Sequence, residues 1–254
     1  QGHRCMTATG RVASRIFLIV ALLGFWQYVP TSRATQFWLS RPSEIAAVLW
    51  HWLEDGSLWG HLGATLIVMV AGYVIGCVSG IGIGFLLGLL PRLHRVVSPY
   101  LAGIYALPKI ALAPLFIIIL GIGYAPKITL VAVTVFFLVL NSTVDGVRDV
   151  DRDQIQSLVL MGASRGEVIR KLLVWAAMPW IFTSMRIAVR YAFTNTLLAE
   201  LFAANRGLGY LIQSSSGNFD STSTYAAITV LMLCSVLLTE VLSRLENKMA
   251  RWKV

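Results

Sequence analysis

The chain has 254 residues, of which 57% are hydrophobic and only 13% are charged, and its mean hydropathy is +0.72. Soluble domains carry about 25% charged residues, so this composition excludes a soluble enzyme or a DNA-binding protein and indicates an integral membrane protein. The formal net charge of +9 therefore reports membrane orientation, and no nucleic-acid partner is expected. The three cysteines, Cys5, Cys77 and Cys234, lie too far apart for a metal-binding spacing, and we expect no metal site.

The first apolar run extends from Ile16 to Val29 and follows two arginines. It resembles a signal peptide, but no small-residue cleavage site follows it. We therefore expect an uncleaved first membrane helix, preceded by a cytoplasmic tail of residues 1–15. Residues 1–5 precede Met6 and are set aside from the fold argument.

Five further stretches approach the 20 or so apolar residues that cross a bilayer core. They are about Ala64–Leu90, Leu101–Leu120, Lys127–Leu140, Phe182–Ala203 and Tyr225–Ser243. The second contains Pro108 and Pro114, which predict a kink, and the third is short. The sequence thus predicts an all-α integral membrane protein with about six transmembrane helices and a transmembrane domain over residues 16–243.

The basic residues are distributed unevenly between the loops on the two sides. Fourteen of the 21 lie in the N-terminal tail, in the loop 91–100, in the segment 141–181 and in the C-terminal tail 244–254. The opposite loops hold four: Arg33, Arg41, Lys127 and Arg206. Because Lys and Arg accumulate in cytoplasmic loops, we expect both termini on the cytoplasmic side of the membrane.

A short helix is expected from Arg41 to Trp50, with Pro42 near its start. Trp50, Trp52 and Trp59 favour the membrane–water interface. Interfacial anchoring on the outer surface is our preferred interpretation, and a partner-binding role is the alternative.

The stretch Ala64–Leu90 carries glycine at every fourth position, and small residues at this spacing let helix backbones approach closely. The stripe is formed by Gly72, Gly76, Gly80, Gly84 and Gly88. Packing within the chain is the preferred interpretation. The alternative is a surface that slides, or the uncluttered lining of a pathway.

The segment 145–180 predicts a cytoplasmic helical hairpin. A helical run from Asp153 to Met161 ends at Gly162, and the S-x-x-E pattern of Ser164 to Glu167 then starts a second helix, which Pro179 closes. Short isolated helices are marginal, so this hairpin needs a surface to dock on. An amphipathic helix lying on the membrane is the alternative.

Two binding motifs are absent from the chain. An EF-hand loop starting at Asp149 would need glycine and glutamate where Gln154 and Leu160 stand. No G-x-x-x-x-G-K-[ST] phosphate loop occurs. If ATP drives this protein, another chain binds the ATP and its Mg²⁺, and this chain needs no cofactor.

The run from Gln156 to Ser164, continuing to Pro179, resembles the EAA loop of permeases of binding-protein-dependent ABC importers. That loop reads roughly E-A-A-x-x-x-G-A-S, and the glycine that makes its bend is present as Gly162. Gln156 stands in place of the glutamate, and Ser157 and Leu158 stand in place of the alanines. The resemblance implies contact with the ATPase through six residues: Gln156, Ser157, Leu158, Gly162, Ala163 and Ser164.

The resemblance extends over roughly residues 40–250, to the nitrate/sulfonate/taurine branch of this family. It is carried by Arg41–Glu44, Asp55–Trp59, His61-Leu62, Leu107–Ala111, Ala113–Phe116, Gly121–Gly123 and Gly207–Ile212. It implies a type I ABC importer permease of the bacterial inner membrane, which forms the translocation pathway as a homodimer or as a pair with a related permease. Its other partners would be ABC ATPase subunits inside, a solute-binding protein outside and the bilayer itself. The solute would be a nitrate-, sulfonate- or taurine-like anion, or a small pyrimidine-type vitamin precursor.

Three polar residues in apolar surroundings are candidates for the translocation pathway or its gate, since such groups are costly in a membrane. Lys109 would meet an anion, or would satisfy carbonyls freed by the prolines. Asn195 would face the pathway, or would bond a neighbouring helix. Glu200 would shape the outer gate, or would cap local structure.

Two other classes of function compete with the permease hypothesis. A self-contained secondary transporter or channel would be expected to show internal repeats, and no convincing repeat is found. An intramembrane enzyme would need a catalytic dyad or metal cluster at membrane depth. The four histidines lie outside the apolar stretches, and no H-E-x-x-H motif occurs.

Overall fold

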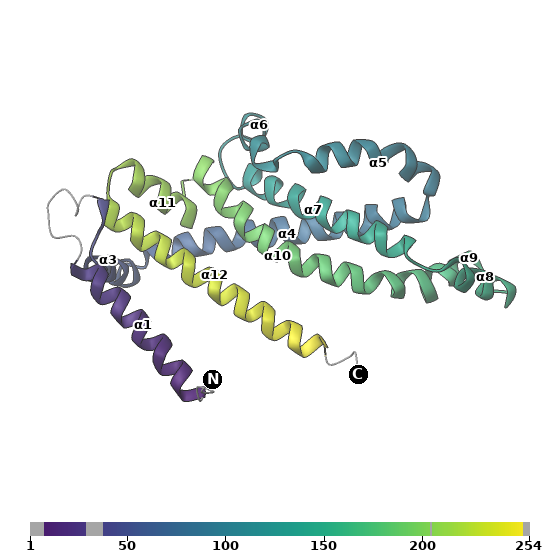
Figure 1. Ribbon diagram of the computed structural model, residues 1–254. Coiled ribbons are helices and arrows are strands. Elements are labelled where there is room, and N and C mark those ends of the chain that lie inside the picture. The colour runs from purple at the N-terminus through teal and green to yellow at the C-terminus, as the bar shows by residue number, and fades with distance from the viewer. Residues whose placement is uncertain (1–7, 29–37, 204, 251–254) are drawn as a thin grey trace. The chain divides into compact units, whose positions relative to one another are not determined.

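The computed structural model describes residues 8–28, 38–203 and 205–250, and every regular element in these ranges is a helix (Figure 1). The chain divides into two compact units. One unit contains residues 1–59 and 211–241, and the other contains residues 60–210 and 242–254.

The first unit contains α1 (Ala8–Tyr28), α3 (Pro42–Glu54), most of α11 (Leu208–Gly217) and most of α12 (Ser221–Ala250). The short helix expected after Arg41 is confirmed as α3, which begins at Pro42. The segment before α3 is bound to α12, because the Tyr225 hydroxyl donates to the Trp38 carbonyl at 3.1 Å and Ser40 bonds Thr222 at 2.9 Å.

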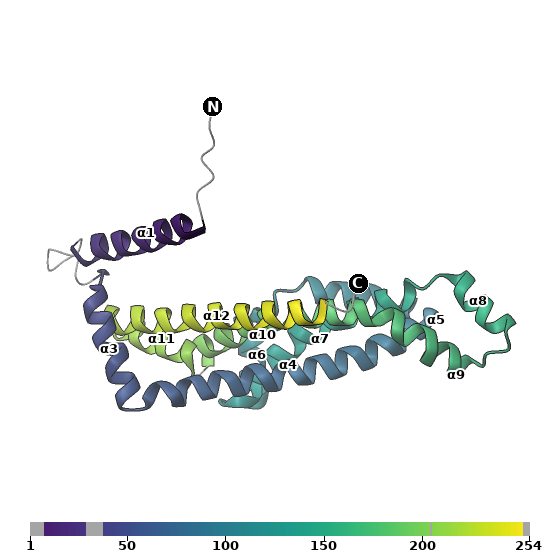
Figure 2. The same ribbon diagram turned by 90° about the horizontal axis from the view of Figure 1, so that it is seen from below.

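The second unit is built on three long helices that run side by side in both views (Figures 1 and 2). These are α4 (Ser57–Leu89), α7 (Tyr124–Arg148) and the helix formed by α9 (Arg165–Val168), η2 (Ile169–Leu173) and α10 (Val174–Ala203). Between α4 and α7 the chain forms α5 (Pro91–Ala106), η1 (Lys109–Leu112) and α6 (Ala113–Leu120). After α7 it forms α8 (Arg152–Leu160).

The core of this unit lies along α7. Val131, Val135, Val139 and Leu140 are fully buried there. They recur with helical spacing, so one face of α7 is covered along its length by α4 and α10.

The glycine stripe of α4 lies directly against α7. A Cβ on Gly72 would stand 2.6 Å from the Val131 Cβ, and a Cβ on Gly76 would stand 2.7 Å from the Ala132 carbonyl oxygen. The same contact repeats farther along both helices, at Gly80, Gly84 and Gly88 against Val139, Thr143 and Val147. Side chains would therefore overlap at every one of these positions, and only glycine allows the two helices to come this close.

Among the described residues, four helices are long and apolar enough to cross a membrane. They are Ser57–Leu89, Tyr124–Arg148, Arg165–Phe202 and Ser221–Val241. A fifth candidate is a broken pair, Pro91–Ala106 with Lys109–Leu120, which bends by 88°. The break falls at Leu107-Pro108, where the sequence predicts a kink. The first expected span, residues 16–29, falls on helix α1 up to Tyr28, and Val29 lies outside the described residues.

Two expectations about these helices are wrong. The span expected from Lys127 to Leu140 is a helix of 25 residues, and Lys127 lies buried in it rather than in an outer loop. Pro179 does not close the second helix of the hairpin, because it lies inside α10. The five-residue π-helical segment η2 precedes it and connects α9 of the hairpin to α10 without a break in the helix.

Candidate functional site

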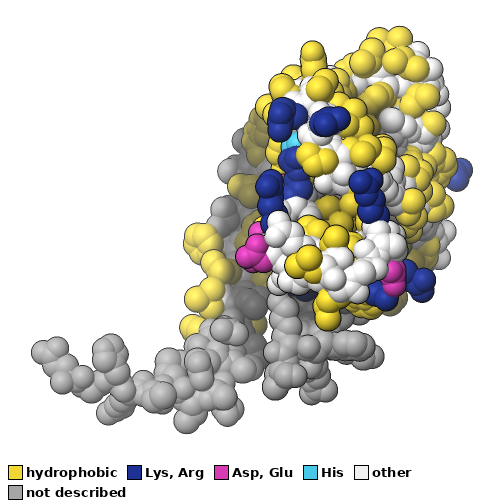
Figure 3. Space-filling view, turned by 90° about the vertical axis from the view of Figure 1, so that its right-hand side faces the viewer, with side chains coloured by type: hydrophobic (Ala, Val, Ile, Leu, Met, Phe, Trp, Pro, Cys, Tyr) yellow, Lys and Arg dark blue, Asp and Glu magenta, His cyan; other side chains and the backbone are white. Residues whose placement is uncertain are grey.

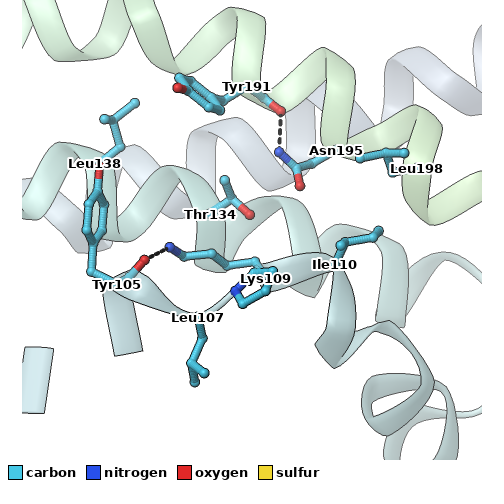
Figure 4. A pocket seen from close by; sticks show the side chains of 10 residues that line it. Tyr105, Leu107, Lys109, Ile110, Thr134, Leu138, Tyr191, Asn195 and Leu198 are labelled. Carbon is cyan, nitrogen blue, oxygen red and sulfur yellow. Dashed lines mark hydrogen bonds between the residues drawn. The ribbon is translucent and has the colours of Figure 1, made fainter. Parts of the chain in front are cut away.

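A cavity of about 270 Å³ lies between the broken pair and the helices α7 and α10 (Figure 4). The lining comes from four parts of the second unit: the end of α5, the break with η1, the middle of α7 and the second half of α10. Its residues are Tyr105, Leu107, Pro108, Lys109, Ile110, Thr134, Leu138, Tyr191, Asn195 and Leu198. The sequence candidates Lys109 and Asn195 therefore line one cavity, although they stand far apart in the sequence.

Lys109 is held at the break between α5 and η1. Its ammonium donates a hydrogen bond to the Tyr105 carbonyl and lies 4.3 Å from the centre of the Tyr105 ring. The break at Pro108 ends α5, so that carbonyl lies in the last turn, where helix carbonyls lack partners within the helix. Lys109 thus supplies the missing donor and also places its positive charge at the cavity wall (Figure 4).

Asn195 faces the same cavity from α10, on the opposite wall from Lys109 (Figure 4). Its amide nitrogen donates to the Tyr191 carbonyl at 2.8 Å, and the residue is 9% exposed. Thr134 of α7 donates its hydroxyl to the Leu130 carbonyl at 3.0 Å. An amide oxygen, a hydroxyl oxygen and an ammonium group thus surround a hollow that also has aromatic and aliphatic walls. Such a cavity suits a small solute that has both polar and apolar parts.

Glu200 is not among the residues that line this cavity. It lies one turn farther along α10 and is 1% exposed. Its carboxylate accepts hydrogen bonds from the Thr65 hydroxyl, 3.0 Å from each oxygen, and from the Gly209 N–H at 3.0 Å. Thr65 in turn accepts from the Leu208 N–H at 2.9 Å. Glu200 thus ties α4 and α10 to the backbone at the start of α11, where free N–H groups favour a negative charge.

The segment Gly207-Leu208-Gly209 packs closely against the Glu200 side chain and the backbone of α10. Gly207 has φ +128°, and a Cβ there would stand 2.2 Å from the Glu200 Cδ. A Cβ on Gly209 would stand 2.6 Å from the Leu197 carbonyl oxygen. The Gly207 N–H donates to His61 Nδ1 at 3.1 Å. Both glycines are therefore required by the close approach of the turn to α10.

The hairpin bend forms at Gly162. This residue has φ +88°, and its N–H donates to the Val159 carbonyl while the Ala163 N–H donates to the Leu158 carbonyl, both at 3.0 Å. This pair of bonds is a Schellman motif, in which a left-handed residue ends a helix and satisfies its last carbonyls. The glycine that the sequence places at the bend thus adopts the backbone conformation that favours glycine.

The second arm of the hairpin begins at Ser164. The Ser164 hydroxyl accepts from the Glu167 N–H at 3.4 Å, and the Glu167 carboxylate accepts from the Ser164 N–H at 3.0 Å, so the expected capping box is present. Lys171 adds an ion pair to Glu167 at 2.8 Å. These bonds define the arm's starting point.

The hairpin exposes apolar side chains at its tip. Leu160 is 87% exposed and Met161 is 83% exposed. Gln156 and Ser157 are exposed on α8, as are Gly162 and Ser164 in the bend, whereas Leu158 and Ala163 are partly buried. The six residues of the EAA-like run therefore lie together on α8 and its bend, next to an exposed apolar tip of the kind that marks an interaction site.

Sequence reasoning missed Thr65, Tyr105 and Tyr191. Thr65 stands alone in an apolar run, and no pattern connects it to a glutamate 135 residues away. The two tyrosines carry no motif either, although each is one helical turn from a candidate, Lys109 or Asn195. The four-residue spacing of each tyrosine from its candidate was the signal that could have placed it beside the same site. Among the described residues, no group of His, Cys, Asp and Glu is arranged to hold a metal ion.

Comparison with known proteins gives the family. Residues 80–251 match the family described as binding-protein-dependent transport system inner membrane component. The chain belongs to this family. The resemblance drawn from the EAA-like run and the flanking motifs is thereby confirmed.

Several relatives have been described by function. The chain is 31% identical to the riboflavin transport system permease protein RibX of Chloroflexus aurantiacus, over 92% of this chain and 88% of that protein. It is 29% identical to the taurine transport system permease protein TauC of Escherichia coli, over 92% and 87%. It is 30% identical to the formylaminopyrimidine transport permease protein ThiX of Halalkalibacterium halodurans, over 79% and 80%.

The fold matches a solved importer. An inward-facing structure of the MetNI methionine ABC transporter superposes with a TM-score of 0.63 at 20% identity, covering 78% of this chain and 96% of that one. The type I importer permease fold is therefore confirmed. The chain is a multi-pass permease subunit of an ABC importer, a membrane translocation component rather than an ATPase.

Proposed function

We propose that the cavity lined by Lys109 and Asn195 is part of the pathway by which a small solute crosses the membrane. Its position between the broken pair, α7 and α10 supports this role, since a broken helix at membrane depth is tolerated where it lines a cavity. The single observation that carries the proposal is the convergence of two polar candidates on one hollow in an otherwise apolar unit.

The solute belongs to the range that the relatives' names span. Taurine and formylaminopyrimidine are small polar molecules, and the ammonium of Lys109 with the amide of Asn195 suits either an anion of the nitrate, sulfonate or taurine type or a small pyrimidine-type vitamin precursor. A solute-binding protein on the outer side delivers it and sets most of the specificity.

The hairpin is the part of this chain that couples ATP hydrolysis by the ATPase subunit to movement of the membrane helices. Its exposed apolar tip beside the EAA-like run supports docking in an ABC ATPase subunit, which binds ATP and Mg²⁺ in place of this chain. Two permease copies, each docked on one ATPase, make up the complex, and both termini of each copy lie in the cytoplasm.

Glu200 lies near the far end of α10, where its hydrogen bonds hold the turn before α11.

Isolation of the complex tests this proposal. The affinity-tagged chain, purified from the membrane of its source organism, should bring down a subunit that carries the G-x-x-x-x-G-K-[ST] motif. ATP hydrolysis by that complex in proteoliposomes should rise when the loaded solute-binding protein is added. Solute uptake by the chain alone, without ATP, would instead identify a secondary transporter or channel.

A further inference from the structure

The first turns of α5 carry three basic residues within four positions. Arg92, His94 and Arg95 follow Pro91, where α5 begins after α4 has ended at Leu89, and the first turn contains no acidic residue. Basic groups are unfavourable at this end of a helix, because the helix dipole is positive there. The arrangement therefore calls for a compensating negative charge from elsewhere.

Helix α7 adds a fourth basic group to the same place. Arg148 lies in its last turn and bonds His94 Nδ1 at 2.7 Å, although the two residues are 54 positions apart. We call Arg92, His94, Arg95 and Arg148 the basic cluster. All four residues belong to one compact unit, and the His94–Arg148 bond joins the start of α5 to the end of α7.

The carboxylates near the basic cluster leave it with a surplus of positive charge. Asp145 lies on α7 about one turn before Arg148, and Asp149 directly follows Arg148. Within the described ranges, no ion pair joins Arg92, Arg95 or Arg148 to either aspartate. Figure 3 shows Lys and Arg side chains gathered around a His on the face at this end of the molecule.

Exposed apolar residues alternate with the arginines along the start of α5. Leu90 is 45% exposed, Leu93 is 41% exposed and Val96 is 67% exposed. The apolar helices α4 and α7 both end here, which places the basic cluster at the depth where lipid headgroups meet their acyl chains. Arg and Lys side chains at such positions reach toward the interface.

We propose that the basic cluster binds the phosphate group of an anionic phospholipid. Arginine matches phosphate with paired N–H donors, and basic pockets between membrane helices bind anionic headgroups. The interleaved Leu90, Leu93 and Val96 favour a lipid over free phosphate, because they give its acyl chains an apolar surface. The lipid phosphate would bridge the start of α5 and the end of α7. Among the hydrogen bonds of the described residues, the His94–Arg148 bond is the one that joins these two helix ends.

Native mass spectrometry of the purified full-length chain tests the proposal. The protein is exchanged into nanodiscs containing phosphatidylglycerol and phosphatidylcholine, released, and scored for the lipids it retains. The double substitution Arg92→Gln with Arg148→Gln should reduce the ratio of retained phosphatidylglycerol to phosphatidylcholine by about tenfold or more, at about one kcal/mol for each basic residue.

Arg152→Gln is the matched control. It removes one positive charge from the start of α8, four residues beyond Arg148 and outside the basic cluster. The single variants Arg148→Gln and Arg152→Gln should differ, with a clear loss of phosphatidylglycerol only in the first. Equal losses in both would mean that positive charge attracts the lipid without a site, and would overturn the proposal.

Two further outcomes would also overturn it. If the double variant retains phosphatidylglycerol like the unmodified chain but no longer co-purifies with its ATPase, the basic cluster is a protein-docking surface. If excess inorganic phosphate protects the unmodified chain against thermal unfolding in phosphatidylcholine alone, and phosphatidylglycerol gives no added protection, the cluster binds free phosphate rather than lipid.

Discussion

Thr65 illustrates how one hydroxyl can connect three helices. It donates to Glu200 and accepts from the Leu208 N–H, so it completes the polar network in which the buried carboxylate is held. Thr65→Val removes that donor and leaves Leu208 without its acceptor. We expect a loss of about 1–3 kcal/mol in unfolding free energy, measured as a lower melting temperature of the purified protein.

Two variants control this measurement. Thr65→Ser keeps the hydroxyl and should restore most of the stability. Thr196→Val removes a hydroxyl that is equally buried and that, within the described part of the chain, bonds only the Ala192 carbonyl of its own helix, so it should cost much less. If Thr196→Val and Thr65→Val destabilise the protein equally, the Glu200 network has no special importance.

Asn195 supplies the residue-scale test of the cavity. Asn195→Leu keeps a similar side-chain volume but removes the amide from the cavity wall, so a polar solute loses a hydrogen-bond partner there. We expect solute uptake by the reconstituted importer to fall about tenfold or more in kcat/KM. Thr194→Val, an exposed neighbour outside the cavity lining, should leave uptake nearly unchanged. Normal uptake by Asn195→Leu would remove Asn195 from the pathway.

At the scale of elements, the contact between α4 and α7 depends on the absence of side chains. Gly76→Val would bring a Cβ to 2.7 Å from both the Ala132 carbonyl oxygen and the Val135 Cβ, so the helices would have to separate. We expect a loss of about 1–3 kcal/mol and reduced yield of folded protein. Gly82→Val lies on the same helix with nothing within 4 Å of its Cβ, and it should be nearly neutral. Similar melting temperatures for the two variants would contradict this packing.

The hairpin bend depends on backbone conformation rather than on space. A Cβ at Gly162 meets nothing within 4 Å, but the φ of +88° is unfavourable for a β-branched residue. Gly162→Val should therefore redirect the hairpin while membrane insertion and dimer formation stay intact. We expect uptake to fall severely, and ATP hydrolysis to lose its response to the loaded binding protein.

Gly166→Val is the matched control for the bend. Gly166 has equally open surroundings but lies in the first turn of α9 with no unusual φ, so this variant should transport normally. If Gly162→Val also transports normally, the hairpin does not transmit the work of the ATPase, and the proposed coupling mechanism fails.

The elements were predictable where their signals are local. The capping box at Ser164, the bend at Gly162, the start of α3 at Pro42 and the break at Pro108 all appear at the positions that the sequence indicates. The continuation of α10 through Pro179 was not predictable in this way, because a π-helical segment and tertiary packing override the local preference of proline. Lys127 was misplaced for a related reason: helix α7 begins before it, and burial of a lysine leaves no local signature.

The site was predictable only in part. Lys109 and Asn195 were found because a polar group in an apolar run stands out, and both line the cavity. Their convergence depends on the register of α7 against α10 and on the broken pair, which no pattern within one helix encodes. The Glu200 network shows the same limit, since its partners come from α4 and from the turn before α11.

At the scale of the whole molecule, the distribution of charge predicts how the chain lies in the membrane. The hairpin, the basic cluster and both terminal segments carry most of the basic residues, whereas Ser57 and Ser216 lie in segments with few. By the positive-inside rule the hairpin faces the cytoplasm, and Ser57 and Ser216 face outward. All three positions chosen for labelling, Ser57, Arg165 and Ser216, are exposed in the structure.

Single cysteines at these positions test that orientation, in a background where the three native cysteines are replaced by serine. Ser57→Cys and Ser216→Cys should react with a membrane-impermeant thiol reagent in intact cells whose outer barrier has been opened. Arg165→Cys should react only after the inner membrane is disrupted, because it starts the second arm of the hairpin. Removing the charge of Arg165 leaves the other basic residues of that side in place, so the substitution itself should not invert the chain. Labelling of Arg165→Cys in intact cells, with Ser57→Cys and Ser216→Cys protected, would reverse the orientation and place the hairpin out of reach of any ATPase in the cytoplasm.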